Sequence, residues 1–270
     1  MTPSAISHHI QLIEDFLGVK LFLRHGGRVS LTSDGRIYSR ELERAFDVIA
    51  GATTLLAPQS QHGHLVIAAG MSFAAKWLQP RLSEFQRAYP DVRIRLSTLS
   101  GTDGLDTDRF DIAIAYELPA TTRHNVEPLL VERLRPLCSP ALAEQIGLRT
   151  LADLSRATLI HSRNAVTWRD YLHRLGMDEL RPANEFWLDR SSMAIDAAVA
   201  GRGVILEGEI LTEDEVRDGR LIAPLDDSST SLETTSYYLV RPKGFRSGVQ
   251  DAAFVKWLRS TLAGNLLKRS

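Results

Sequence analysis

The first residues of the chain alternate apolar and polar positions with the period of an amphipathic helix. The apolar side chains at this spacing are Ile6, Ile10, Ile13 and Leu17. Thr2-Pro3-Ser4 is typical of a capped helix start, and Gly18 is typical of a helix end. The opposite face carries small or hydrogen-bonding groups instead of the glutamates and lysines usual on a solvated face. The pattern predicts a helix over residues 4–17.

Two further elements precede a polar linker at residues 58–63. Apolar runs at 19–22 and 29–31 flank the turn at 25–28, which predicts a hairpin with basic residues at its tip. Thr32 is a typical cap for a helix over residues 33–57 that ends at Pro58. The apolar seam of this helix, spaced by four and three residues in turn, consists of Tyr38, Leu42, Ala45, Ile49, Ala52 and Leu56. Such a seam favours pairing with a second helix, so we expect it to form a dimer interface.

Strands alternate with helices from residue 64 onward. The predicted strands cover residues 65–69, 92–96, 111–115, 159–161, 186–188, 204–206 and 237–240, and the predicted helices cover 72–88, 168–175, 193–200 and 249–262. This alternation predicts an α/β fold with parallel sheets covered by helices. Residues 127–140 have no clear helical pattern, and we expect them to form strands that carry the chain from one sheet to a second.

Composition and charge narrow the class of protein. The chain has 270 residues, of which 44% are hydrophobic and 24% charged, as in ordinary globular domains. No apolar run reaches the roughly 18 residues of a membrane span, and the first residues do not resemble a secretion signal. The single cysteine, Cys138, excludes an internal disulfide and a cysteine-based zinc site. We therefore expect a cytoplasmic protein without membrane contact.

Basic residues are concentrated near the start of the chain. The whole chain has a net charge of −1, whereas residues 1–40 carry five Lys or Arg and three acidic residues, a net charge of +2. A positive terminal segment on a nearly neutral protein points, weakly, toward an anionic partner for that segment.

The chain resembles the LysR-type transcriptional regulators, and within them the branch that includes glycine-cleavage activators. The resemblance extends over nearly the whole chain and rests on the motifs at residues 2–8, 17–22, 31–35, 72–78, 89–92, 110–114 and 198–204. It implies a winged helix-turn-helix and a dimerising linker helix within residues 1–57. It also implies a two-lobed effector-binding domain, similar to periplasmic binding proteins, over residues 64–270. Lobe one would comprise residues 64–137 and 243–270, and lobe two residues 138–242.

The start of the chain departs from the pattern of that family. Members have two helices before the recognition helix, whereas this sequence begins at the turn that leads into it. We expect either a start codon assigned too late or a truncated regulator, in which the winged helix-turn-helix is partial.

Double-stranded DNA is the expected partner of the first helix. A helix in the major groove needs short side chains where it approaches the bases, hydrogen-bonding groups that read them, and cations nearby for the phosphates. The candidate DNA-binding residues are Ser4, Ser7, His8, His9, Gln11, Arg24 and Arg28. The alternative is a polar face that only contacts water. A metal site is not expected, because adjacent histidines on a helix point in different directions and no third ligand has the right spacing.

A small anionic effector, an amino acid or an organic acid, is the expected ligand of the second domain. Two-lobed α/β domains bind ligands at strand carboxyl ends, where helix starts present backbone N–H groups. The candidate effector-binding residues are Ser72, Phe73, Thr98, Ser100, Tyr116, His161, Trp168, Ser191 and Ser192. The serines could instead be simple helix caps, His161 a half-buried histidine and Trp168 a core residue. Arg190 and Arg202 are weaker candidates for supplying charge.

The residue pattern does not indicate an enzyme or a cofactor. The sequence has no nucleophile elbow, phosphate loop, dinucleotide fingerprint or zinc motif. We expect a homodimeric or homotetrameric regulator. The rival hypotheses are a stand-alone small-molecule binding protein without competent DNA binding, and a truncated regulator that pairs with a full-length relative and blocks it.

Overall fold

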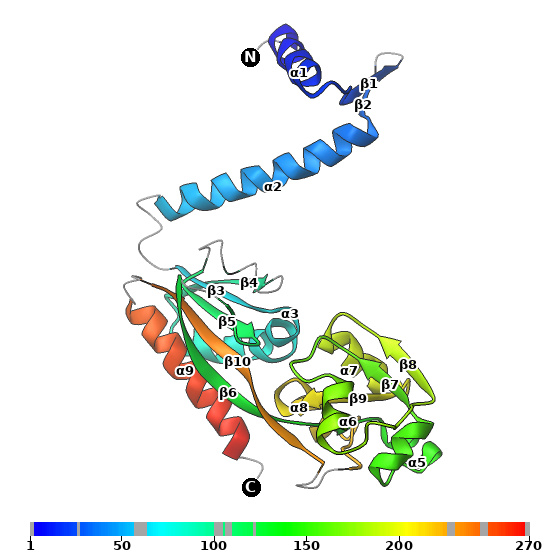
Figure 1. The fold of residues 1–270 in the computed structure, drawn as a ribbon. Helices are drawn as coiled ribbons and strands as arrows, with labels where there is room; N and C mark the ends of the chain where they lie inside the picture. Colours follow the sequence, from blue (N-terminus) through cyan, green and yellow to red (C-terminus); the bar gives the residue numbers. More distant parts are fainter. Residues whose placement is uncertain are drawn as a thin grey trace. The chain divides into compact units, whose positions relative to one another are not determined.

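A computed structural model describes residues 3–25, 28–56, 64–99, 105, 110–120, 123–225, 230–243 and 248–267 (Figure 1). The chain divides into two compact units, Met1–His62 and Gly63–Ser270. Among the described residues, no helix has both the length and the apolar character needed to cross a membrane.

The first unit contains the predicted helix, hairpin and long helix. They are α1 (Pro3–Leu17), β1 (Phe22–His25), β2 (Arg28–Leu31) and α2 (Ser33–Leu56). The first strand begins at Phe22 and not at residue 19 as expected. The reason is Glu14 of α1, whose Oε1 accepts hydrogen bonds from the backbone N–H groups of Leu21 (2.8 Å) and Phe22 (3.2 Å). This carboxylate holds the connection between helix and hairpin against α1.

Thr32 joins the hairpin to α2 in the way the sequence predicts. Its hydroxyl accepts a hydrogen bond from the Gly35 N–H (2.9 Å) and donates one to the Lys20 carbonyl (2.7 Å). Gly35 packs directly on the backbone of Leu21, because a Cβ at that position would lie 2.1 Å from the Leu21 carbonyl oxygen. A larger residue than glycine would therefore separate α2 from the hairpin.

The second unit is built on one eight-stranded mixed sheet, in the order β4-β3-β5-β10-β6-β9-β7-β8. The strands are β3 (His64–Gly70), β4 (Arg93–Leu99), β5 (Ile112–Tyr116), β6 (His124–Leu137), β7 (Thr158–His161), β8 (Asn184–Trp187), β9 (Val204–Gly208) and β10 (Leu232–Pro242). Strands β3, β4 and β5 are parallel, as are β7, β8 and β9, which agrees with the predicted alternation of strands and helices.

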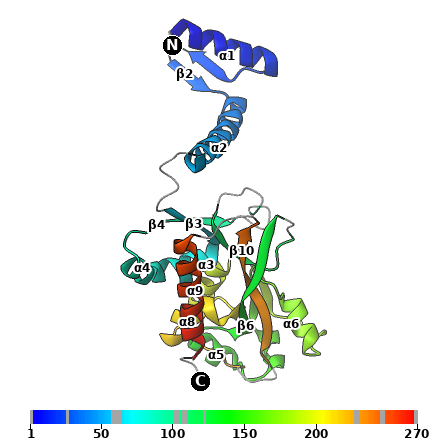
Figure 2. The ribbon, with the colours of Figure 1, turned by 90° about the vertical axis from the view of Figure 1, so that its left-hand side faces the viewer.

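The expectation of two separate sheets is wrong. Residues 127–140 were expected to connect them, but most of this segment belongs to the single long strand β6, which pairs antiparallel with β10 and with β9. Strand β10 also pairs with β5, so β6 and β10 run through the centre of the unit and join its two ends (Figures 1 and 2). We call the end with β3, β4 and β5 the first lobe and the end with β7, β8 and β9 the second lobe.

Helices cover both lobes. They are α3 (Met71–Phe73), the π-helical turn η2 (Ala74–Leu78), α4 (Gln79–Ala88), α5 (Pro140–Ile146), the 3₁₀ helix η4 (Leu151–Arg156), α6 (Trp168–Arg174), α7 (Ser191–Val199), α8 (Glu209–Arg217) and α9 (Val249–Leu267). The sequence pattern does not predict α5, η4 or α8. Helix α8 reads Glu-Ile-Leu-Thr-Glu-Asp-Glu-Val-Arg, whose few apolar residues give a weak helical stripe.

Two apolar clusters form most of the core. The larger one packs Trp77, Phe85 and Phe254 of the first lobe together with Ile205 and Leu211. The smaller one lies in the second lobe and contains Cys138, Trp168 and Tyr171. Because the larger cluster includes residues of β9 and α8, the lobes share part of their core.

Removal of the Glu14 side chain should loosen the first unit at the hairpin. Lys20 hydrogen-bonds to the second oxygen of Glu14 (2.7 Å) and lowers the pKa of that carboxyl, so this contact is present above pH 4.5 and is lost as the pH falls further. In Glu14→Ala we expect the backbone amides of Leu21 and Phe22 to exchange with solvent about tenfold faster, measured by hydrogen exchange. Asp15→Ala is the control, and equal exchange rates in the two variants would contradict this role.

Candidate functional site

A cavity of about 110 Å³ lies where strand ends of the first lobe meet the start of α7 in the second lobe. We call it the interlobe cleft. Its lining residues are Gly70, Met71, Ser72, Phe73, Leu99, Leu105, Ala115, Tyr116, Glu117, Arg163, Asp189, Arg190, Ser191, Leu211 and Tyr237. Four of the candidate effector-binding residues, Ser72, Phe73, Tyr116 and Ser191, are therefore brought together from segments far apart in the sequence.

The starts of two helices touch across this cleft. The backbone N–H of Ser192 donates to Ser72 Oγ (3.1 Å), and the two serine hydroxyl oxygens lie 3.5 Å apart. Neither serine occupies an N-cap position, because Gly70 precedes α3 and Arg190 precedes α7. Neither of these two cap residues makes a side-chain hydrogen bond to its helix. The starts of α3 and α7 both line the cleft, and helix starts are places where backbone N–H groups can bind an anion.

Charged side chains of both signs surround the cleft. Arg163 and Arg190 line it from the second lobe, together with Asp189. Glu117 lines it from the first lobe with a φ of 66°, a left-handed conformation that is costly for a residue other than glycine and common at binding sites. Arg163 and Glu117 are not predicted from the sequence, since both lie in irregular segments without a motif, and Arg190 is only a weaker candidate there.

Tyr116 links the two lobes beside the cleft. Its hydroxyl donates to Asn164 Oδ1 (2.8 Å) and accepts from the backbone N–H of Ala165 (2.9 Å). Burial, and then the nearby Glu207, raise the pKa of Tyr116 far above its usual value, so the hydroxyl keeps its proton and remains a donor. The tyrosine predicted as a cleft residue therefore also connects β5 to the loop before α6.

Other candidates for effector binding lie elsewhere. Thr98 is exposed on β4 and does not line the cleft, whereas its neighbour Leu99 does, because successive strand residues point to opposite faces. Ser100 falls outside the described residues. Trp168 is a core residue whose Nε1 donates to the Ile160 carbonyl (3.0 Å), as the alternative interpretation proposed.

His161 and Trp168 line a second, larger cavity of about 1190 Å³ that is confined to the second lobe. The His161 ring stacks on Trp187, with ring centres 3.8 Å apart and an interplanar angle of 8°. Its Nε2 lies 3.2 Å from Glu185 Oε1, while burial lowers the pKa of the imidazole. This cavity is larger, but only one helix start, that of α6, lines it, whereas the starts of α3 and α7 both line the interlobe cleft.

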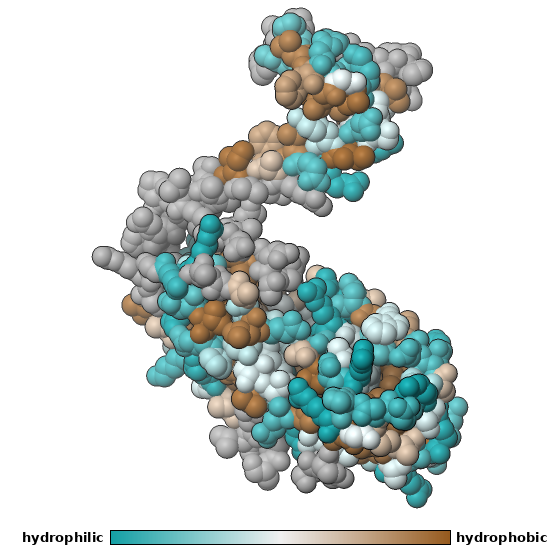
Figure 3. Space-filling model, in the orientation of Figure 1, coloured by the Kyte–Doolittle hydropathy of each residue, from teal (hydrophilic) through white to brown (hydrophobic). Residues whose placement is uncertain are grey.

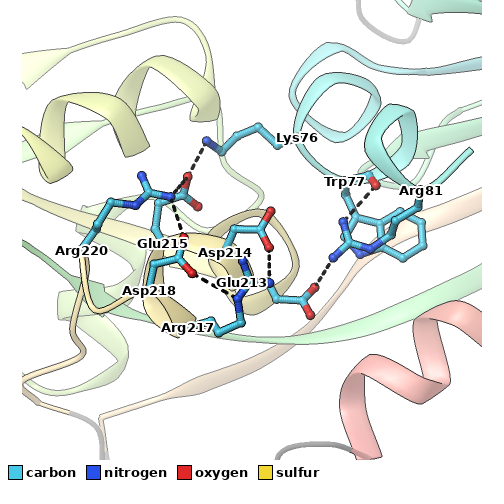
Figure 4. A network of polar contacts seen from close by, with 9 residues as sticks. All are labelled: Lys76, Trp77, Arg81, Glu213, Asp214, Glu215, Arg217, Asp218 and Arg220. Atoms are coloured by element: carbon cyan, nitrogen blue, oxygen red, sulfur yellow. Dashed lines mark hydrogen bonds and ion pairs between the residues drawn. The ribbon is translucent and has the colours of Figure 1, made fainter. Parts of the chain in front are cut away.

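Ion pairs connect the first lobe to α8 (Figure 4). Lys76 Nζ lies 3.0 Å from Glu215 Oε1 and 3.7 Å from Asp196 Oδ1 of α7. Arg81 Nη2 lies 2.8 Å from Glu213 Oε2, and its guanidinium stacks over the Trp77 ring. Helix α8 is thus attached to the helical segment η2–α4, although in sequence it follows the second-lobe strand β9.

The polar face of α1 is open in the first unit. Ser7, His8, His9 and Gln11 are all exposed. The Gln11 side chain donates to Asp15 Oδ1 (2.7 Å), so it must turn away from Asp15 to reach any partner. Ser4 lies in α1, Arg24 in β1 and Arg28 in β2, but their side chains fall outside the described part of the chain.

The predicted seam of α2 lies largely at the surface. Leu42 is 38% and Ile49 58% exposed, Ala45 is also exposed, and Tyr38 is half-buried. Ile37 and Phe46, outside the predicted seam, are exposed as well, and Figure 3 shows apolar residues on the surface of this unit. The side chains of Ala52 and Leu56 fall outside the described residues.

The described part of the chain contains no group of three or more His, Cys, Asp or Glu side chains that could hold a metal ion. Cys138 is buried, and burial raises the pKa of its thiol to about 11. This cysteine is therefore a poor nucleophile at neutral pH.

Two protein families match this chain. The family described as "Bacterial regulatory helix-turn-helix protein, lysR family" matches residues 1–36, and the family described as "LysR substrate binding domain" matches residues 58–263.

Individual relatives match over most of their length. The glycine cleavage system transcriptional activator of Escherichia coli is 33% identical over 264 residues, which cover 97% of this chain and 86% of the relative. The regulator PerR of E. coli is 36% identical, covering 97% and 87%. Among solved structures, the effector domain of AmpR from Pseudomonas aeruginosa is 28% identical with a TM-score of 0.65, covering 76% of this chain and 98% of that domain. CrgA from Neisseria meningitidis, at 22% identity and a TM-score of 0.61 over 97% of this chain and 90% of that one, shares the fold.

The ion pair between Arg81 and Glu213 should contribute to the attachment of α8 to the first lobe. Both side chains are more than four-fifths buried, so we expect a coupling free energy of about 1 kcal/mol in a double-mutant cycle with Arg81→Ala and Glu213→Ala, measured by urea unfolding. The exposed pair Arg217–Asp214 on α8 is the control and should give about 0.3 kcal/mol. Equal coupling in both cycles would contradict a special role for the first pair.

Proposed function

Because this chain belongs to the LysR family of bacterial transcriptional regulators, with a helix-turn-helix segment and an effector-binding domain, we propose that a small anionic effector binds in the interlobe cleft and changes how the protein engages double-stranded DNA. The observation that carries this proposal is the meeting of two helix starts and two arginines around one cavity. The cavity volume of about 110 Å³ favours a molecule of the size of a small amino acid or organic acid.

Recognition of a carboxylate would use groups from the second lobe that are oriented toward the cleft. Arg163 and Arg190 supply positive charge, and the backbone N–H groups at the start of α7 supply hydrogen-bond donors. Asp189 and Glu117 supply negative charge at the same cavity, which suits an amino acid with its ammonium group as well as a simple acid.

Effector binding would change the relative orientation of the lobes. The contacts that now close the cleft, Ser192 to Ser72 and Tyr116 to Asn164, join one lobe to the other. A ligand between the helix starts must replace or rearrange the first of these. Effector binding would thereby favour one lobe orientation over another and alter the spacing of the DNA-binding segments in an oligomer.

The first unit would provide the DNA contacts and the pairing of chains. In this proposal residues 4–17 form the recognition helix, with Ser7, His8, His9 and Gln11 toward the bases and Arg24 and Arg28 toward phosphates. The exposed apolar residues of α2 would pack against a second copy, which gives a homodimer or homotetramer.

The proposed domains are residues 1–57 for DNA binding and dimerisation and 64–270 for effector binding, in a cytoplasmic protein. The rival hypothesis of a stand-alone binding protein leaves the helix-turn-helix match at residues 1–36 without a purpose.

Substitution of Arg163, one of the two arginines that line the cleft, is the sharpest test of the effector proposal. Small carboxylates and amino acids, screened by thermal shift, should raise the melting temperature of the wild type. For the best binder, Arg163→Gln should weaken affinity about tenfold to a hundredfold through loss of a charged hydrogen bond, measured by calorimetry. Arg174→Gln on α6 is the control. Unchanged affinity in Arg163→Gln would show that the anion is bound elsewhere.

Two substitutions in the first unit separate phosphate contacts from base contacts. Arg28→Ala should weaken binding to all DNA and reduce the slope of log affinity against log salt by about 1, whereas Gln11→Ala should relax sequence preference. Fluorescence anisotropy with operator and random duplexes over a range of salt measures both effects. A salt slope that Arg28→Ala leaves unchanged would contradict the role of the hairpin tip.

A further inference from the structure

Two buried glutamates contact residues next to the interlobe cleft, and effector binding as described above does not use them. Glu132 on β6 is 4% exposed and Glu207 on β9 is 2% exposed. Neither makes an ion pair with a Lys or Arg among the described residues. A buried carboxylate without a cation is costly, so these two groups require an explanation.

Glu207 contacts the groups that shape the cleft wall. Its Oε1 accepts a hydrogen bond from Ser162 Oγ (2.7 Å), and the side chains of Ser191 and Asn164 are also hydrogen-bonded to this carboxyl. Ser191 lines the cleft at the start of α7. Asn164 accepts the hydrogen bond of the Tyr116 hydroxyl, so Glu207 reaches both the second-lobe wall of the cleft and the tyrosine of the first lobe.

The side chain of Glu132 reaches from β6 to the first turn of α8. Its Oε1 accepts a long hydrogen bond from the Ile210 backbone N–H (3.4 Å). A Cβ at position 208 would lie 2.3 Å from the same oxygen, so Gly208 leaves the space that the carboxyl fills. The next residue of α8, Leu211, lines the cleft. The second carboxyl is thus tied to a cleft wall as well.

The electrostatic surroundings disfavour two negative charges here. Burial raises the pKa of Glu207 to about 7, although hydrogen bonds from Ser162, Ser191 and Asn164 oppose this shift. Burial raises the pKa of Glu132 to about 7 as well, and the charge of Glu207 adds to the effect. Tyr116, Tyr237 and Glu209 also face the pair, and none of them is a cation. The nearest cation in the strand register is Arg135 of β6, which lies opposite Glu207 on β9 and is 3.8 Å from Glu209 Oε1.

We propose that Glu207 is a positioning residue of the effector cleft that carries a proton, and that a carboxylate bound above it drives the uptake of a further proton from solvent onto the Glu132–Glu207 pair. The coupling to a bound carboxylate rests on the proposed function, whereas the protonation of Glu207 does not depend on it. A neutral Glu207 accepts the Ser162 hydrogen bond and keeps Ser191 and Asn164 in place without a buried charge. An added anion in the cleft repels a second negative charge below it, so proton binding and effector binding strengthen each other.

The proton on Glu207 is tested without any ligand. A carboxyl whose pKa rises from 4.5 to about 7 on folding contributes stability at low pH that is lost as the pH increases through 7. The folding equilibrium constant of the wild type, from urea unfolding of the full chain, should therefore fall by about a hundredfold per such group between pH 5 and pH 8. Glu207→Gln should show a markedly smaller fall, and Glu144→Gln, at an exposed position of α5, should follow the wild type.

A second measurement covers the case in which Glu207→Gln does not fold. NMR of wild-type protein labelled with ¹³C at the glutamate carboxyl carbons should show at least one resonance that titrates near pH 7. If every glutamate titrates below about pH 5.5, or if Glu207→Gln has the pH profile of the wild type, the proton on Glu207 is refuted.

The coupling to the cleft is tested with acetate, which stays ionised above pH 6. Calorimetry at pH 7 in two buffers of different ionisation enthalpy should show proton uptake on acetate binding, and affinity should fall about tenfold between pH 6 and pH 8. In Glu207→Gln, binding should take up less proton, and affinity at pH 8 should approach that of the wild type at pH 6. Binding without proton uptake would overturn the coupling. No binding at any pH would contradict the carboxylate effector and the coupling with it, while the unfolding titration still decides the protonation of Glu207.

Discussion

The antiparallel pairing of β6 with β10 is the constraint on which the second unit depends. It continues from Leu232 opposite Leu134 to Pro242 opposite His124, and the same two strands pair with β9 in one lobe and with β5 in the other. The lobes can therefore bend or twist about this ribbon but cannot part. The register of β10 shifts around Ser236, whose carbonyl accepts the N–H of the strained Glu117 at the cleft. The irregular part of the ribbon thus lies beside the binding cavity.

Contacts across the cleft are weaker than this ribbon and of a different kind. They are individual hydrogen bonds, such as Ser192 to Ser72, and single ion pairs, such as Lys76 with Glu215, whose side chains are mostly buried. Each contributes on the order of 1 kcal/mol, so a ligand with a differential binding energy of a few kcal/mol can shift the balance between lobe orientations. Helix α8 is central because it touches the cleft through Leu211 and is attached to the first lobe through Arg81.

Polar groups organise the first unit, whereas many of its large apolar side chains remain at the surface. Glu14 and Thr32 hold helix, hairpin and linker helix together through hydrogen bonds. Phe16 is 89% and Phe46 65% exposed, which leaves apolar area for contacts beyond this unit. A regulator that functions as an oligomer on DNA needs such surfaces, because the linker helix alone cannot bury its own seam.

Local patterns in the sequence determined the helix over residues 4–17, the cap at Thr32, the alternation of strands and helices, and the family, because these depend on spacing and on turn residues near each other in the chain. Ser72, Tyr116 and Ser191 could be predicted at strand ends and helix starts for the same reason. Only the tertiary structure decided that β6 and β10 form one continuous sheet, that Arg163 reaches the cleft while His161 and Trp168 line another cavity, and that Glu132 and Glu207 are buried without cations. Those outcomes depend on which face of each strand points inward and on contacts between residues far apart in sequence, and a periodic pattern contains neither.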